Sequence, residues 1–537
     1  MSATVQELIE NGQTALGIEL GSTRIKAVLI GPDHEVLATG AHSWENQIVD
    51  GLWSYSLSAV KEGLCDAYAT LVAQVKERYG VVPTTYGSLG ISAMMHGYLA
   101  FDADGKQLAP FRTWRNTNTG RAAAELIDTF HFNIPLRWSI AHLHQAVIDE
   151  ETHVPQIASI NTLSGWVHEQ LTGRHVLGIG DASGMFPIDS VAGDFDASMV
   201  TSYDELVAPR HLPWRLSDLL PTVLSAGEDA GVLTEEGALL LDPTGTLRPG
   251  IAMCPPEGDA GTGMVATNSV AQRTGNISCG TSVFLMIVLE KALKRLHTEV
   301  DMVTTPDGSP VAMVHSNNGS SELDEWVGMF VEFAQLAGMD MKVSDVYDLL
   351  YFNALKGDAD GAGLLAYNTL SAEPIMGLEG GRPLFTHTPD ATFTLANAFR
   401  VQLMSVFAAV RIGLDILADE GVGLDKVFAH GGLFKTPGVA QKILADSLGI
   451  AASVGETAGE GGAWGIAVLA QFMKSRGEGE TLPEYLDSKV FANVWSILQA
   501  LRSHDERIEA KVNALALHQE AAKNKYQGSA DHKGWDE

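Results

Sequence analysis

Two short turns in this chain combine glycine with hydroxyl residues in a way that suits an anion. The first is Gly21-Ser22-Thr23, with Glu19 before it and Lys26 after it; the second is Gly280-Thr281-Ser282, about 260 residues later. Glycine lets backbone N–H groups face a phosphate, and the hydroxyls add further donors. One such turn alone is most simply an ordinary hairpin. Two in matching contexts indicate phosphate binding, with Glu19 placed to hold metal-bound water.

A carboxylate and a glycine pair could complete phosphoryl-transfer chemistry. Asp259 lies in the glycine-flanked segment EGDAGTG at 257–263, where a base could reach an acceptor hydroxyl. The alternative is a capping aspartate before a helix, and the residues alone leave both open. Gly431-Gly432 follows a short apolar run and precedes Lys435, so a nucleotide could lie against the backbone there. The alternative is a plain strand-to-helix turn.

The elements that must position these residues occur twice along the chain. Residues 15–30 and 274–289 each predict a hairpin whose bend is one of the two turns. Apolar residues at spacings of three and four predict a helix over 54–79, closed by Gly80, and another over about 393–418. Strands are expected at 87–94 and 426–432, and Thr436 is expected to cap a helix from Pro437 to Gly449. Duplication of one mixed α/β unit accounts for this pattern.

The expected division is 1–267 for an N-terminal domain and 268–537 for a C-terminal domain. The boundary follows a segment rich in glycine and proline at 227–267. A helical C-terminal tail is expected from about 481 to 525, and the final SADHKGWDE is expected to be disordered.

The acidic composition of the chain excludes some classes of binding partner. The 537 residues carry a formal net charge of −31, from 35 Lys+Arg against 66 Asp+Glu. Such a surface should repel nucleic acid and anionic membranes, while a local cradle can still bind a nucleotide. Three scattered cysteines, a polar start and no long apolar run predict a cytoplasmic protein without a disulfide framework, signal peptide or membrane span.

Taken together, the motifs resemble those of the FGGY family of carbohydrate kinases, in the actin-like ATPase superfamily, from about residue 15 to about 470. The family's first phosphate motif D-x-G-T-x-x-x-K corresponds here to ELGSTRIK, and its GTS loop to Gly280-Thr281-Ser282. Its adenosine motif GGGAKSP corresponds to GGLFKTP at 431–437, and its catalytic G-D pair to Gly258-Asp259. The resemblance implies an α/β fold of two actin-like (ribonuclease H-like) ATPase domains, an active site in the interdomain cleft, and ATP and magnesium as cofactors.

On the substrate side the sequence is most similar to xylulokinases. MMHG at 94–97 resembles their QMHG, and DASGMFPID at 181–189 resembles their DASG segment, although SAMMH at 92–96 also fits a gluconokinase. Two departures stand out. Glu19 replaces an aspartate, and the family's W-x-D-x-R becomes WRNTN at 114–118, which removes a carboxylate and an arginine near the sugar.

The expected activity is transfer of the γ-phosphoryl group of ATP to a hydroxyl of a pentulose such as xylulose. The resemblance implies Asp259 as general base and Glu19 as the magnesium residue. It places Met95, His96 and Asn116 at the sugar. The phosphate and nucleotide residues would be Gly21, Ser22, Thr23, Lys26, Gly280, Thr281, Ser282, Gly431, Gly432 and Lys435. The rival hypotheses are an aldonate kinase, a catalytically weak sugar sensor that keeps the fold, and a chaperone-like ATPase of the same superfamily, against which the MMHG and DASG segments argue. The expected partners are a small-molecule sugar and, as an assembly to be tested, a second copy of the chain.

Overall fold

The structure is a computed structural model, and it describes residues 4–454 and 461–492. Two compact units divide the chain. Of the described residues, unit 1 contains 4–271, 301–311 and 461–492, and unit 2 contains 272–300 and 312–454. The continuous division at 267/268 had left two of these segments in the C-terminal half, whereas they pack in unit 1. As a division into functional domains it stays a prediction.

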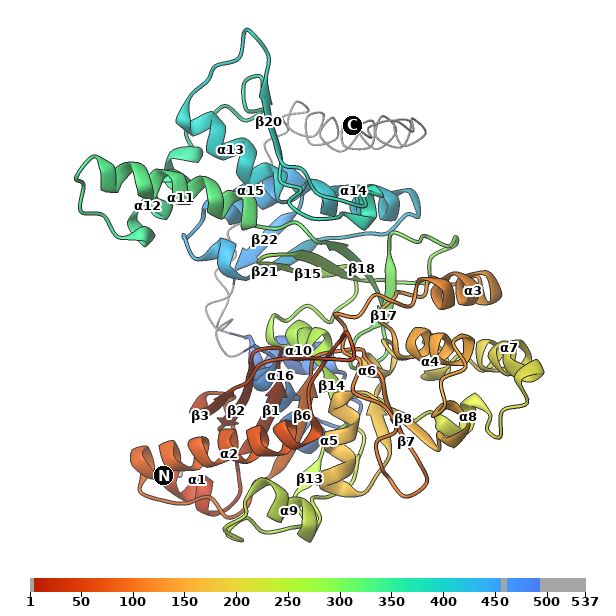
Figure 1. The fold of residues 1–537 in the computed structure, drawn as a ribbon. Coiled ribbons are helices and arrows are strands. Elements are labelled where there is room, and N and C mark those ends of the chain that lie inside the picture. Colours follow the sequence, from red (N-terminus) through yellow and green to blue (C-terminus); the bar gives the residue numbers. More distant parts are fainter. Residues whose placement is uncertain (1–3, 455–460, 493–537) are drawn as a thin grey trace. The chain divides into compact units, whose positions relative to one another are not determined.

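A mixed sheet forms the centre of unit 1 (Figure 1). Its strands run in the order β13-β6-β1-β2-β3, with β14 also paired to β6. Strand β2 is antiparallel to both β1 and β3, whereas β6 is parallel to β1 and to β13 and β14. The bounds are β1 Ala15–Leu20, β2 Arg24–Ile30, β3 Val36–Ser43, β6 Ser88–Ala93, β13 Ala252–Met253 and β14 Glu257–Gly258.

Two long helices cover opposite faces of this sheet, and glycines set how closely they approach. A Cβ on Gly17 would lie 2.1 Å from the Ala463 carbonyl oxygen of α16 (Gly461–Ser475). A Cβ on Gly40 would lie 2.1 Å from the Ala67 carbonyl oxygen of α2 (Leu57–Tyr79). The strand register places Gly17 and Gly40 on opposite faces, because side chains alternate along a strand. Helix α2 confirms the helix expected over 54–79, and Gly80 ends it in a left-handed conformation.

Shorter elements complete unit 1. They are α1 Val5–Glu10, β4 Gln47–Val49, β5 Leu52–Ser54, β7 Leu99–Phe101, α3 Gly120–Phe130, α4 Ser139–Ile148, β8 Ser159–Asn161, α5 Leu163–Thr172, β9 Val176–Gly178, α6 Ile179–Ala182, β10 Ile188–Asp189, β11 Asp194–Phe195, α7 Ala197–Val207, α8 Leu216–Leu219, β12 Thr222–Leu224, α9 Glu235–Leu241, α10 Asp259–Ala266, β17 Asp301–Thr304 and α17 Leu482–Tyr485. Helix α10 packs on α16, and α5 packs on β6.

The sheet of unit 2 repeats the arrangement of the first. Its strands run β18-β16-β15-β21-β22, with β15 antiparallel to β16 and parallel to β21. In both units the order along the sheet is third, second, first, fourth, fifth, counted in chain order. This shared topology confirms the expected duplication. The bounds are β15 Thr274–Cys279, β16 Val283–Val288, β18 Pro310–Ser316, β21 Lys426–His430 and β22 Ala451–Val454.

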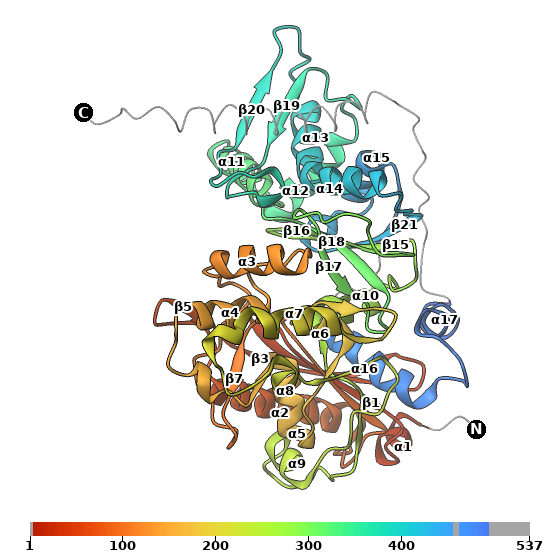
Figure 2. The ribbon, with the colours of Figure 1, turned by 90° about the vertical axis from the view of Figure 1, so that its right-hand side faces the viewer.

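The remaining described elements of unit 2 are helices and one hairpin (Figure 2). They are α11 Ser321–Leu336, α12 Val343–Ala354, β19 Leu364–Tyr367, β20 Leu384–His387, α13 Leu395–Ser405, α14 Ala408–Asp419 and α15 Val439–Leu448. The hairpin of β19 and β20 packs against α13.

Three sequence-based expectations on helices need correction or lie partly outside the described residues. The single helix expected over 393–418 is two helices, α13 and α14, bent by 49°. The helix expected to start at Pro437 starts at Val439 after Gly438, and the Thr436 hydroxyl instead donates to Asp348 on α12. Beyond α17 and the π-turn Leu486–Val490, the expected helical tail and the final SADHKGWDE lie outside the described residues.

In the described part of the chain, no single helix is long and apolar enough to cross a membrane. Helices α13 and α14 meet that test of length and composition only when taken as a pair.

Candidate active site

The first phosphate turn is held by its carbonyl groups. The Trp44 indole N–H donates to the Gly21 oxygen at 2.7 Å, the Tyr55 hydroxyl donates to the Ser22 oxygen at 2.6 Å, and the Trp44 backbone N–H donates to the Thr23 oxygen at 3.1 Å. The two rings stack with centroids 4.3 Å apart. Within residues 4–454 and 461–492, the backbone N–H groups of Ser22 and Thr23 have no recorded acceptor. The turn is therefore anchored through its carbonyl groups, and its two remaining backbone N–H groups could donate to an anion.

Glu19 lies one residue before the end of β1, on the face that α16 covers. It pairs across the ladder with Lys26 on β2 and lies beside Ser92 on β6. A Cβ on Gly462 would lie 2.6 Å from Glu19 Oε1 and 2.7 Å from Thr262 Oγ1. The Thr262 and Ser92 hydroxyls are 3.0 Å apart. The carboxylate thus ends in a polar layer where α10 and α16 meet the sheet, and a glycine leaves room for it.

Asp259 is the first residue of α10, directly after strand β14. Its Oδ1 accepts the backbone N–H of Met95 at 3.0 Å. Gly258, not Asp259, is the N-cap of α10, and no side chain forms a capping hydrogen bond there. Burial raises the pKa of Asp259, and backbone N–H groups of Met95 and Ala260 partly offset this by stabilising the charged form. A raised pKa makes the carboxylate a stronger base.

His96 follows Met95 in a left-handed conformation, with φ of 69°. Its Nδ1 lies 3.2 Å from the Gly184 carbonyl oxygen, and its ring lies nearly parallel to Trp138 with centroids 6.4 Å apart. Because a carbonyl only accepts, Nδ1 carries the proton and Nε2 is left as an acceptor in the neutral ring. Burial, together with the charge of Arg137, holds the pKa of His96 well below its usual range. The ring is therefore neutral at physiological pH.

The loop of Met95 and His96 thus connects three parts of unit 1. Met95 is 6% exposed, and its side chain packs where Gly258 and Gly184 leave space: a Cβ on either would lie within 3 Å of it. The loop follows β6, faces the start of α10 and contacts the turn after α6. The structure therefore brings Met95, His96 and Asp259 together, as expected from the sequence.

The second phosphate turn, in unit 2, is held in the same way as the first. The Gly280 oxygen accepts the Ser320 N–H and the Thr281 oxygen accepts the Gly319 N–H, each at 2.8 Å. No acceptor is recorded among the described residues for the backbone N–H groups of Thr281 and Ser282. Both turns therefore use their carbonyl groups for support and keep two amides for a ligand.

The glycine pair lies beside this second turn. Strand β21 pairs with β15 up to His430 and Ser278, so Gly431 reaches the end of β15. Gly431 has φ of 112°, and a Cβ on it would lie 2.2 Å from the Cys279 carbonyl oxygen. Gly432 has open space around its Cα, and Lys435 is exposed. Only glycine fits at position 431, for conformation and for space.

Family models match two long stretches of the chain. The N-terminal domain model of the FGGY family of carbohydrate kinases matches residues 14–245, and the C-terminal domain model of the same family matches residues 275–473. The chain belongs to the FGGY family of carbohydrate kinases. It is therefore a sugar kinase, and kinases of this family use ATP as the phosphate donor.

Individual relatives agree with this assignment. A curated xylulose kinase from Haemophilus influenzae is 22% identical over 450 residues, which cover 81% of this chain and 86% of the relative. The solved xylulose kinase from Rhodospirillum rubrum has a TM-score of 0.78 at 17% identity, over 96% of this chain and all of that one. The gluconate kinase from Lactobacillus acidophilus has a TM-score of 0.74 at 14% identity, over 96% of this chain and 99% of that one. These likenesses confirm the expected fold of two actin-like ATPase domains.

The altered W-x-D-x-R segment of this FGGY kinase has a clear structural task. The Asn116 amide accepts the Trp53 N–H at 2.8 Å and donates to the oxygens of Trp53 and Thr113 at 2.8 and 3.1 Å. The Arg115 guanidinium lies 4.0 Å from the centre of the Trp53 ring. Asn116 is thus bound on both its polar atoms to backbone, and its contact with a sugar stays a prediction.

Two buried carboxyl groups near the candidate base Asp259 have no role predicted from the sequence. Asp181 is fully buried and Glu257 is 1% exposed. Glu257 stands two residues before Asp259 in the same glycine-rich segment, and this second carboxyl group was the available signal.

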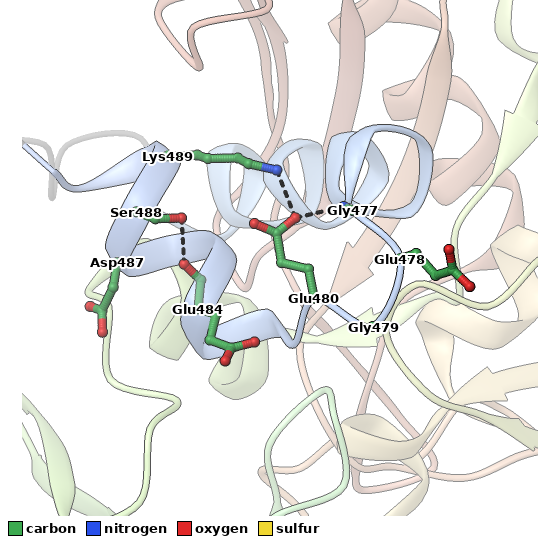
Figure 3. Close-up of a pocket in the computed structure, with 8 residues that line it drawn as sticks. All are labelled: Gly477, Glu478, Gly479, Glu480, Glu484, Asp487, Ser488 and Lys489. Atoms are coloured by element: carbon green, nitrogen blue, oxygen red, sulfur yellow. Dashed lines mark hydrogen bonds and ion pairs between the residues drawn. The ribbon is translucent and has the colours of Figure 1, made fainter.

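A shallow pocket of about 710 Å³ lies elsewhere in unit 1, after the end of α16 (Figure 3). Four of its eight lining residues are acidic, and one of them, Glu480, forms an ion pair with Lys489 at 2.6 Å. None of the sequence-predicted site residues lines it. Among the described residues, no group of three or more His, Cys, Asp or Glu side chains could by itself hold a metal ion.

Proposed function

We propose that this FGGY kinase transfers the γ-phosphoryl group of ATP to a hydroxyl of a pentulose such as xylulose. The observation that carries the proposal is the bond from the Met95 N–H to Asp259 Oδ1 at 3.0 Å. It joins the candidate base to the loop that carries His96. The similarity to xylulose kinases supports a pentulose, and at 22% identity the choice of sugar is the part that experiment must decide.

Asp259 would act as the general base. A sugar hydroxyl is a weak nucleophile at neutral pH, and its proton needs an acceptor as the bond to phosphorus forms. The Met95 amide fixes Oδ1, which leaves Oδ2 to accept that proton. Burial raises the pKa of Asp259 and so brings it closer to the working pH, which favours general-base catalysis.

His96 and Met95 would bind the sugar beside this base. The neutral ring of His96, with its proton on Nδ1, offers Nε2 as an acceptor for a sugar hydroxyl. The Met95 side chain would cover an apolar face of the sugar. Asn116 would also contact the sugar, from a position that its bonds to the Trp53 backbone fix.

The phosphate residues would work through backbone N–H groups and hydroxyls. Ser22 and Thr23 in unit 1, and Thr281 and Ser282 in unit 2, would bind ATP phosphates, with Lys26 nearby in unit 1. In unit 2, Gly280 would shape the second turn, Gly431 and Gly432 would border the nucleotide, and exposed Lys435 would contact its phosphates. Exclusion of water from the bound ligands would suppress plain ATP hydrolysis.

Glu19 is a suitable residue to hold the magnesium ion that accompanies bound ATP. Magnesium in kinase sites is usually held by one or two carboxylates, waters and substrate phosphates, so a single carboxylate suffices. Glu19, through water, is the residue that would hold it, and the ion when bound neutralises phosphate charge. The longer side chain of glutamate reaches further than the family's aspartate, which suits a water-bridged contact.

A cytoplasmic location and a homodimer belong to the proposal as well. All three cysteines, Cys65, Cys254 and Cys279, are unpaired, as expected in a reducing compartment where ATP is made. Light scattering coupled to size-exclusion chromatography would test the dimer.

ADP release with a panel of sugars tests the proposed function. The panel contains xylulose, ribulose, hexuloses, polyols and aldonates, each with MgATP. We expect a pentulose to stimulate ADP release most and to raise the melting temperature, since a ligand that binds only the folded state stabilises it. Strongest stimulation by gluconate would replace the pentulose with an aldonate. No stimulation by any sugar would favour the sensor.

A further inference from the structure

Glu257, on the strand that precedes Asp259, connects two segments of unit 1. Its carboxylate accepts the N–H groups of Gly180 and Asp181, at 3.3 and 3.0 Å. These amides belong to α6, while Glu257 belongs to β14, which pairs with β6. Glu257 is 1% exposed, so the carboxylate makes these bonds away from bulk water. It therefore fixes the backbone of the DASG segment against the strand that leads to Asp259.

Two glycines of unit 1 leave space for the Glu257 carboxylate. A Cβ on Gly178 would lie 2.3 Å from Glu257 Oε1, and a Cβ on Gly180 would lie 2.5 Å from Oε2. Neither glycine has a positive φ, so space and not conformation requires glycine at both positions. The absence of side chains at these two glycines therefore makes room for the Glu257 carboxylate.

Asp181 places a second carboxyl group beside strand β14. Its Oδ2 accepts the hydroxyls of Thr162 and Ser164, the first at 2.8 Å. Its Oδ1 is buried and has no partner among the described residues. A Cβ on Gly258 would lie 3.1 Å from this oxygen, so the group lies directly behind the residue that precedes Asp259.

We propose that Asp181 and Glu257 are positioning residues for Asp259, and that the pair does this only while it retains a proton. The pair would hold the junction of β14 and α10 so that Asp259 keeps its bond to the Met95 amide. This inference rests on the proposed role of Asp259 as base. It adds two residues to the proposed site and a dependence of turnover on pH.

The charges around the pair explain why it needs the proton. The titratable groups that face it are Asp259 on α10, the Cys254 thiol before β14 and the neutral His96 ring against Gly184. Thr162, the N-cap of α5, and Ser164 within this helix contribute the two hydroxyls. Burial raises the pKa of Asp181 to about 7, and burial together with the Asp181 charge raises the pKa of Glu257 well above its usual range. Loss of the last proton would add a negative charge next to Asp259 in a site that cannot hydrate it.

Asp181→Asn is the sharpest test, because asparagine imitates the protonated acid. Its oxygen can keep the bonds from Thr162 and Ser164, and its NH₂ takes the place of the unpartnered Oδ1. Turnover should be followed from pH 6 to 9 with the sugar that stimulates ADP release most, alongside melting temperature. We expect wild-type kcat to fall at least threefold from pH 7 to 9, and Asp181→Asn to hold its kcat within twofold over that range.

Two further variants complete the experiment. Glu257→Gln loses one of two acceptors, so we expect kcat to fall about tenfold while the Michaelis constant for ATP changes less than twofold. Asp307→Asn is the matched control: Asp307 is another carboxyl of unit 1 whose pKa is raised by burial, and it binds Thr305. The control should keep the alkaline fall of the wild type. Ser164→Ala is a milder probe should Asp181→Asn fail to fold, and it should displace the alkaline fall to higher pH by making Asp181 harder to ionise.

The outcomes separate this inference from the proposed function. If folded Asp181→Asn or Ser164→Ala shows the wild-type pH profile and Glu257→Gln has wild-type kcat, the pair is structural only and the inference is wrong. If Asp259→Asn keeps wild-type turnover, the base itself is wrongly assigned, whatever the pair does. A different preferred sugar changes the substrate and leaves the test of the pair intact.

Discussion

The Met95 backbone N–H donates to Asp259 Oδ1 across 3.0 Å, although the two residues are 164 positions apart in the chain. This bond fixes the candidate base relative to the loop that carries His96. It engages one carboxylate oxygen, Oδ1, and in the proposed mechanism the other oxygen accepts the proton of the sugar hydroxyl.

Glu19 tests the tolerance of the magnesium position. We expect Glu19→Asp to keep activity within roughly tenfold, about 1.4 kcal/mol of barrier, because a water can bridge the added distance. Glu19→Ala should reduce turnover far more, since no carboxylate remains. Kinetics at several magnesium concentrations check this, and wild-type turnover in Glu19→Ala would remove Glu19 from the mechanism.

His96 tests the sugar side of the site. His96→Ala should raise the Michaelis constant for the sugar more than it lowers kcat, and should leave that for ATP nearly unchanged. Because His96 has a φ of 69°, alanine also introduces backbone strain. His96→Asn is the control, since asparagine tolerates this conformation. If both variants raise only the Michaelis constant for ATP, the loop of Met95 and His96 does not bind the sugar and the assignment is wrong.

Buried His142 predicts a loss of stability in acid. Burial lowers the pKa of His142 to about 3, from an ordinary value near 6.5, and neither ring nitrogen has a partner among the described residues. Below pH 6.5, His142 binds a proton in the unfolded chain but stays neutral in the folded chain. The free energy of unfolding therefore falls as the pH falls from 6.5 toward 3. At pH 5 this one group costs about 2 kcal/mol.

Urea unfolding at pH 7 and pH 5 measures this effect. His142→Leu should reduce the difference in unfolding free energy between the two pH values by about 2 kcal/mol. His387→Leu, which removes an exposed histidine of unit 2, should leave that difference unchanged. An unchanged difference in His142→Leu would show that the ring is protonated or hydrated in the folded chain.

The glycine pair allows a matched comparison within two adjacent positions. Gly431→Ala places a Cβ 2.2 Å from the Cys279 carbonyl oxygen at a φ of 112°, so it should destabilise unit 2 by about 2 kcal/mol or more and weaken ATP binding. Gly432→Ala enters open space and should change stability by less than about 0.5 kcal/mol. Thermal unfolding measures both, and equal melting temperatures would contradict the close approach at Gly431.

The parts of the fold that sequence could predict are those specified locally. The two hairpins with their glycine turns and helix α2 each follow from a short pattern of residues. The C-terminal helix α16 could not be placed this way, because its packing on β1 depends on Gly17, far away in the chain. Thr436 misled for a related reason: Asp348, 88 residues away, binds its hydroxyl and removes it from capping.

In the candidate site, too, sequence could predict only what neighbouring residues specify. Asp259, His96 and the turns were recognisable because motif residues lie close together in sequence. The task of Asn116 depends on Trp53, 63 positions earlier, and the bonds of Glu257 depend on amides 76 and 77 positions earlier. Only a folded chain shows that an acidic residue fills the space left by two glycines.

The most direct test of the account is Asp259→Asn. Asparagine has nearly the shape of aspartate and can still accept the Met95 N–H, but it cannot take a proton from a sugar hydroxyl. We predict that the variant keeps its melting temperature and its affinity for nucleotide and sugar, while kcat falls roughly 100-fold or more. A folded variant that binds both ligands and turns over at close to the wild-type rate would contradict the assignment of Asp259 as the base.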